Sequence, residues 1–201
     1  MDASPSPTAK PMATLARAVS IGGHPMVLVP AAIAIAMRGR VSRSEATIVL
    51  GVVFGAIAIV AAYLVHGVRS GRLSHVDVSK REERGGFYGV ALVSTFAATV
   101  VLALSPAPRA APLGFGCAFA LLAVASVVNR WLKASLHTAF AIVAAGVVGP
   151  GAPLPFAIFA TAAGLVAWSR VVLGRHTRRE VFVGAILGGV TAIVLAFVRP
   201  S

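Results

Sequence analysis

Residues 47–68 read TIVLGVVFGAIAIVAAYLVHGV, and this stretch decides the fold class. It contains no Asp, Glu, Lys or Arg. As a helix it would be about 33 Å long, enough to cross a hydrocarbon core of roughly 30 Å. Because backbone groups inside a membrane must be hydrogen-bonded within the segment, a helix is the form that suits this length. We therefore interpret residues 47–68 as a transmembrane helix.

Other apolar segments of similar character lie along the rest of the chain, at residues 19–37, 87–104, 113–128, 135–148, 154–168 and 181–198. Of the 201 residues, 58% are hydrophobic and only 12% are charged, which is not typical of a soluble domain. The sequence predicts an all-α, polytopic transmembrane bundle of six or seven helices, formed as a single domain by residues 17–201. Residues 1–16, which are rich in Pro, Ser and Ala, are expected to form a disordered tail.

Charged residues fall in the short loops between these segments and give a net charge of +12. No aromatic-rich basic domain accompanies them, so we expect no nucleic-acid partner, and anionic lipids or a phosphorylated lipid substrate fit better. If all seven segments cross, thirteen basic residues lie on the side of the three polar clusters described below, and five lie opposite. The positive-inside rule then predicts a multi-pass protein of the cell (plasma) membrane whose site faces the cytoplasm.

Two glycine pairs have the four-residue spacing that lets helix backbones approach closely. They are Gly51 with Gly55 and Gly184 with Gly188. We favour packing within the bundle over a dimer interface for both pairs, although the sequence leaves a homo-oligomer open.

The polar cluster with the most chemistry covers residues 168–180 and reads WSRVVLGRHTRRE. His176 and Glu180 are four residues apart, so on a helical turn they share a face and the carboxylate can orient the imidazole ring. An oriented imidazole can act as a nucleophile or a base. Arg170 supplies a planar, permanently charged group that suits phosphate oxygens. The cluster therefore predicts a phosphate site.

This cluster resembles the third signature of the type-2 phosphatidic acid phosphatase superfamily, which includes lipid phosphate phosphatases and relatives of vanadium haloperoxidases. That signature is Ser-Arg, five residues, His, three residues and an acid, usually Asp and here Glu180. Residues 130–137, RWLKASLH, are similar to the second signature, Pro-Ser-Gly-His. They keep Ser135 and His137 but lack the Pro and the Gly.

The first signature, Lys, six residues, Arg and Pro, has the weakest counterpart, in residues 77–85, DVSKREERG. Arg84 matches the arginine, Gly85 replaces the Pro, and Asp77 stands seven residues before Arg84, where it could form a salt bridge with a neighbouring base. Either Lys80 or Arg81 could replace the missing lysine, and the sequence does not choose between them.

The resemblance implies phosphomonoester or diphosphate hydrolysis of a phosphatidate-like or polyprenyl lipid. His176 would attack phosphorus to form a phosphohistidine, with Glu180 orienting its ring, and His137 would protonate the leaving alkoxide. The groups that would hold the phosphate are Arg170, Arg84, Ser135 and one of Lys80 and Arg81. The site would lie in converging loops at one membrane face.

We expect no metal and no cofactor, because the six acidic residues lie mainly in separate loops and no His-rich ligand pair is visible. His24, His66 and His75 match no pattern and receive no chemical role. Two other functions stay open. The chain could be a degenerate relative that binds lipid phosphates without cleaving them, or a small transporter whose basic loops only set its topology.

Overall fold

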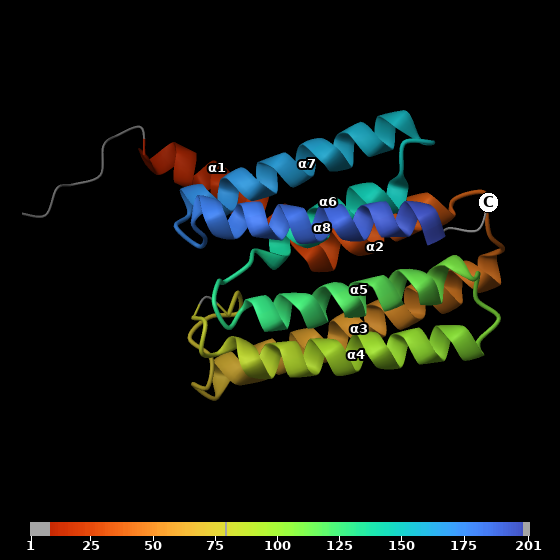
Figure 1. The fold of residues 1–201 in the computed structure, drawn as a ribbon, viewed down its shortest axis with the longest axis horizontal. Helices are drawn as coiled ribbons and strands as arrows, with labels where there is room; N and C mark the ends of the chain where they lie inside the picture. The colour runs from red at the N-terminus through yellow and green to blue at the C-terminus, as the bar shows by residue number, and fades with distance from the viewer. Residues whose placement is uncertain (1–8, 79, 199–201) are drawn as a thin grey trace, which may run out of the picture.

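The computed structural model describes residues 9–78 and 80–198, and within these ranges the only regular elements are helices (Figure 1). They are α1 (Ala9–Gly22), α2 (Pro25–Met37), α3 (Arg43–Arg69), α4 (Arg84–Leu104), α5 (Ala110–Val128), α6 (Leu136–Val148), α7 (Pro153–Val172) and α8 (Arg178–Val198). The all-helical architecture predicted from the sequence is confirmed.

Five of the described helices are long and apolar enough to cross a membrane: α3, α4, α5, α7 and α8. A sixth span is possible if α1 and α2 count as one, because Pro11–Gly22 and Pro25–Met37 are bent by 51° at a short break. The sequence predicted one uninterrupted helix over residues 19–37. It breaks there because Pro25, which has no backbone N–H to continue α1, instead begins α2.

The N-terminal tail differs from the prediction within the described residues. Residues 9–16 belong to α1, so the expectation of disorder was wrong for them, and residues 1–8 of the predicted tail lie outside the described ranges. Helix α1 packs along α7, and Ala16 is fully buried. Burial against another helix stabilises a short segment whose composition alone did not indicate a helix.

Helix α6, which was predicted to cross the membrane, has only 13 residues, which corresponds to a length of about 20 Å. That is less than the roughly 30 Å of a hydrocarbon core, so α6 does not qualify as a span by length. It nevertheless runs through the centre of the bundle, between α2, α7 and α8 (Figure 1). Its first turn therefore lies inside the protein, next to the ends of its neighbours.

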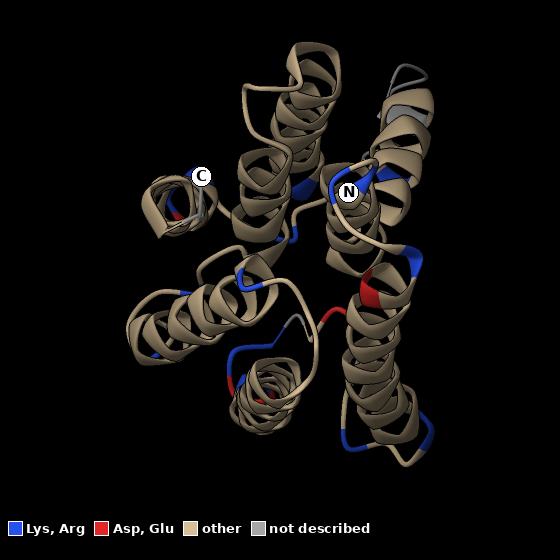
Figure 2. Ribbon diagram, turned by 90° about the vertical axis from the view of Figure 1, so that its right-hand side faces the viewer, with Lys and Arg blue, Asp and Glu red and all other residues tan. Residues whose placement is uncertain are grey.

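The three polar clusters lie at the same end of the bundle. In Figure 1 the connections α3–α4, α5–α6 and α7–α8 are all at the left, and α2–α3, α4–α5 and α6–α7 are at the right. Figure 2, which looks along the helices, shows charged residues mainly at helix ends and in loops, around tan helix bodies. The sequence-based expectation that the clusters converge is met.

Close helix packing positions α6. A Cβ added to Gly184 would collide with the backbone of Ser135, and one added to Gly188 would collide with the backbone of Ala139. This glycine pair therefore packs within the bundle, as the spacing predicted. Gly51 and Gly55 have no neighbouring atoms within 4 Å at the same positions, so bundle packing does not account for them.

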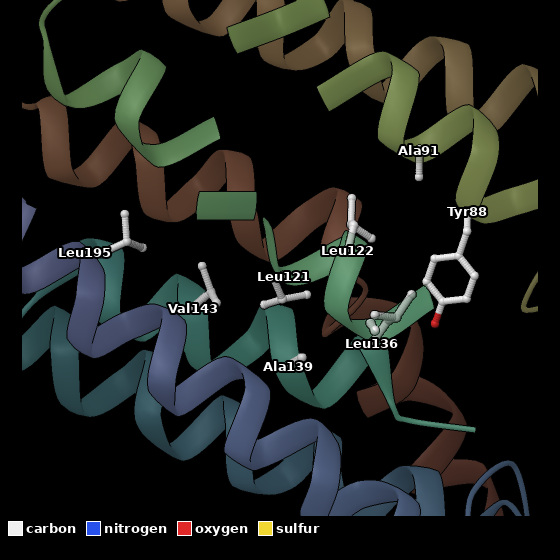
Figure 3. Close-up of a cluster of buried hydrophobic side chains, with 9 residues drawn as sticks. Tyr88, Ala91, Leu121, Leu122, Leu136, Ala139, Val143 and Leu195 are labelled. Carbon is white, nitrogen blue, oxygen red and sulfur yellow. The ribbon is translucent and has the colours of Figure 1, made fainter. Parts of the chain in front are cut away.

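A cluster of buried apolar side chains lies between α4, α5, α6 and α8 and packs these four helices together (Figure 3). Tyr88 and Leu136 belong to it at the end that carries the polar clusters, and Leu195, in the last turn of α8, belongs to it toward the opposite end. Because Leu136 directly precedes His137, packing of this cluster also fixes the first turn of α6.

Candidate active site

The α7–α8 connection is built by local hydrogen bonds. Arg175 and His176 both donate their backbone N–H groups to the Arg170 carbonyl, at 3.0 and 3.1 Å, which closes the end of α7. Gly174 has φ of +63°, a conformation that suits glycine, and it turns the chain back toward the bundle. His176 is thereby placed under the end of α7, with an exposed fraction of 5%.

Glu180 has two roles at the start of α8. Its backbone N–H donates to Thr177 Oγ1 at 3.3 Å, and its Oε2 accepts from the Thr177 N–H at 3.0 Å, so the two residues form a capping box. The same Oε2 lies 3.0 Å from His176 Nδ1. The contact predicted from the spacing is present, and Glu180 is held in place for it by the helix cap.

His176 is neutral in this environment. Burial, followed by the positive charges of Arg84 and Arg170, lowers its pKa to about 3. A neutral imidazole with one nitrogen oriented by a carboxylate has the form that a nitrogen nucleophile requires.

Arg170 is almost completely buried, with a side-chain exposed fraction of 2%. Its Nη1 donates to Ser20 Oγ at 2.8 Å and to Asp77 Oδ2 at 3.1 Å, and its Nη2 donates to the same Asp77 oxygen at 3.2 Å. Its Nε has no partner among the described residues. The base that pairs with Asp77 is therefore Arg170, on a distant helix, while one donor of the guanidinium group is left unused.

Asp77 lies in the α3–α4 connection and is only partly exposed. Burial raises the pKa of its carboxyl group, but Arg170 and His137 outweigh this effect and hold the pKa below the ordinary value. Asp77 is therefore ionised and occupies two nitrogen donors of Arg170.

The other predicted residues divide into two groups. Arg84 is buried and donates to the backbone carbonyls of Val78 at 3.1 Å and Ala134 at 3.0 Å, and its charge acts on His176. Lys80 and Arg81 are both exposed, and Lys80 lies 3.7 Å from Glu83. The structure thus brings Arg84 to the site and does not bring Lys80 or Arg81.

Ser135 and His137 open α6. The Ser135 hydroxyl is fully buried and caps the helix by accepting from the Thr138 N–H at 3.5 Å, and it also accepts from the Thr138 hydroxyl at 3.1 Å. The Ser135 backbone N–H donates to the Glu180 carbonyl at 3.1 Å. His137 Nε2 is buried without a hydrogen-bond partner and lies 3.9 Å from Asp77 Oδ1. The α6 N-terminus is thus tied directly to the start of α8.

His24 was not assigned a role by sequence reasoning. It caps α2, where its Nδ1 accepts from the Met26 N–H at 3.2 Å, and its ring lies edge-on to His137 with centroids 4.8 Å apart. His24, Asp77 and His137 together form a group of three side chains whose ligand atoms could hold a metal ion. The available signal was a histidine at a helix break, between Gly23 and Pro25.

A cavity of about 690 Å³ begins at these polar residues and extends into the bundle. Its polar end includes His24, Asp77, Arg84 and His137, its walls are mainly apolar, and it also contacts Arg40 and Arg109 from the opposite side of the bundle. His176 and Arg170 are not among its lining residues. Arg170 contacts the polar end through Asp77, which lines the cavity.

No family model, curated protein or solved structure matches this chain significantly. The functional argument therefore depends on the geometry of the site.

Proposed function

We propose that this membrane protein is a phosphatase that hydrolyses a phosphomonoester or diphosphate of a phosphatidate-like or polyprenyl lipid. The observation that carries the proposal is the buried, neutral His176, held by Glu180 at 3.0 Å and placed within range of the charges of Arg84 and Arg170. An oriented imidazole beside two fixed cations suits attack on a phosphoryl group whose oxygens need positive partners.

The proposed reaction has two steps. His176 attacks phosphorus, the bond from phosphorus to the lipid oxygen breaks, and His137 gives its proton to the leaving alkoxide. Water then attacks the phosphohistidine and gives a proton to His137, and the bond from phosphorus to the His176 nitrogen breaks, releasing inorganic phosphate and a free imidazole. Arg170, through its unused Nε, and Arg84 would stabilise the charge on the phosphoryl oxygens.

The cavity supports a lipid substrate rather than a soluble one. Its apolar walls suit a hydrocarbon chain, and its polar end, at His137 and Arg84, suits a phosphate head group. Because His176 and Arg170 do not line the cavity, Asp77, which lines it and holds Arg170, must move aside for a bound phosphate to reach them.

The direct test is phosphate release from a panel of lipid phosphates by the purified protein, with EDTA present. We expect His176→Ala to reduce the rate about a thousandfold or more, since no other group replaces the nucleophile. His66→Ala, an exposed histidine on α3, is the matched control and should keep the wild-type rate. Equal rates for His176→Ala and wild type would rule out the mechanism.

One observation favours a second function, the binding of lipid phosphates without cleavage. Asp77 occupies Arg170, and neither Lys80 nor Arg81 reaches the site. Saturable binding of lipid phosphate, with no phosphate released across the whole panel, would favour this second function over the phosphatase.

We propose that the site faces the cytoplasm, as the charge distribution of the loops predicts. A cysteine placed at exposed Ser74, in a Cys117→Ser background, would test this. An impermeant maleimide should label it in inside-out vesicles and not in intact cells. The reverse pattern would place the site on the outer face.

A further inference from the structure

We infer that His24, Asp77 and His137 form a binding site for one divalent transition-metal ion of the zinc type, at the polar end of the cavity. The three residues come from separate places in the fold: the cap of α2, the α3–α4 connection and the first turn of α6. One potential ligand atom from each lies within 4.8 Å of the others. His137 Nε2 is buried there without a hydrogen-bond partner.

The donor set indicates the class of ion. Two imidazole nitrogens and one carboxylate oxygen are ligands that zinc accepts in tetrahedral sites, whereas Ca²⁺ and Mg²⁺ prefer oxygen donors throughout. Three protein ligands leave a fourth position open, and these residues line the cavity. Zinc holds its donors about 3.3 Å apart, so small side-chain rotations must bring the most distant pair closer by roughly 1.5 Å.

The groups around the three ligands also support such a site. Arg170 holds Asp77 Oδ2 with two nitrogen atoms, which leaves Oδ1 directed toward His137 at 3.9 Å. Hydrogen bonds to ligating carboxylates orient them for metal binding. Ser20 fixes Arg170 in turn, at 2.8 Å.

Two local features oppose metal binding, and they determine which variant should lose the most affinity. His24 Nδ1 accepts from Met26, so coordination through Nε2 must move the ring proton to Nδ1 and break this cap, a smaller interaction than a metal–ligand bond. Arg170 places a positive charge next to the ion, so the charge of Asp77 is essential. We therefore expect the neutral Asp77→Asn variant to lose the most affinity.

The test uses the full-length protein in detergent, stripped with a chelator. Zn²⁺ is titrated calorimetrically, and Co²⁺ is followed by its visible absorption. Wild type should bind about one equivalent, and His24→Ala, His137→Ala and Asp77→Asn should each weaken binding at least about tenfold. His66→Ala is the matched control and should bind as wild type does. Equal binding by wild type and a variant lacking all three ligands would overturn the inference.

A variant that gains a signal guards against loss of binding through misfolding. His24→Cys offers a thiolate in place of an imidazole, so its Co²⁺ complex should show a new sulfur-to-metal absorption band. An unchanged spectrum for a folded His24→Cys protein would exclude His24 as a ligand.

One consequence rests on the proposed function. His137 cannot hold a metal ion and donate a proton at the same time, so Zn²⁺ should slow phosphate release by wild type, and the slowing should weaken in Asp77→Asn when each protein is compared with its own metal-free rate. Metal binding by a protein that releases no phosphate would contradict the proposed phosphatase function and support the metal site. Phosphate release without metal binding would support the phosphatase function and contradict the metal site.

Discussion

The two connections that form the site, α7–α8 and α3–α4, differ in how their functional residues are positioned. In α7–α8, His176 and Glu180 are four residues apart and are held by a capping box and a glycine turn. In α3–α4, Asp77 is held by Arg170, which is 93 residues away. The comparison teaches that local geometry orients His176, whereas a long-range ion pair determines which group occupies Arg170.

The largest expected effect concerns the α7–α8 connection. Glu180→Gln keeps an oxygen for the capping box, so the melting temperature should change little, but it removes the negative charge that would stabilise the positive charge developing on the His176 ring as it attacks phosphorus. We expect phosphate release to fall by about 10³ to 10⁴. Glu82→Gln, at an exposed position, is the control. A Glu180→Gln rate within twofold of wild type would show that Glu180 serves only as a helix cap.

A smaller effect, on stability, is expected where the two connections meet. Arg170→Ala leaves the Asp77 carboxylate partly buried without its partner and should destabilise the protein by about 3 kcal/mol. Asp77→Asn, combined with Arg170→Ala, should recover part of this loss. Denaturation in detergent of the two single variants and the double variant would measure the coupling. Strict additivity would mean that the Arg170–Asp77 pair contributes nothing.

The pH dependence of stability should reflect the α7–α8 connection. His176 has a folded-state pKa of about 3, below the ordinary value of 6.5, so between these values the unfolded chain binds a proton that the native protein does not. The contribution of neutral His176 to stability is complete above pH 6.5 and decreases as the pH falls toward 3. Melting temperatures at pH 7.5, 6 and 4.5 should therefore fall more steeply for wild type than for His176→Gln. Parallel curves would mean that His176 is not buried as a neutral ring.

The smallest effects are expected in the exposed part of the α3–α4 connection. Lys80→Ala and Arg81→Ala should each change phosphate release by less than about threefold and stability by less than about 0.5 kcal/mol, because both residues are exposed. Arg84→Ala is the contrasting variant and should lose most activity, since Arg84 is buried. A large loss in Lys80→Ala or Arg81→Ala would show that the substituted residue acts at the site despite its exposure.

The sequence by itself determined the features that depend on neighbouring residues. Long apolar runs predict membrane helices because a bilayer leaves the backbone no other partners, and the spacing of His176 and Glu180 places them on one helical turn. The Gly184–Gly188 spacing likewise predicted the close packing of α8, which is observed against α6.

Only the tertiary structure decided the rest of the site. Ser20, His24 and Asp77 are brought to Arg170 and His137 by helix packing, and no local pattern connects residues so far apart in the chain. Burial also showed that Arg84 reaches the site while Lys80 and Arg81, between which the sequence did not choose, both stay exposed. The physical reason is that low-dielectric surroundings make charge pairing decisive, and those surroundings exist only once the helices have packed.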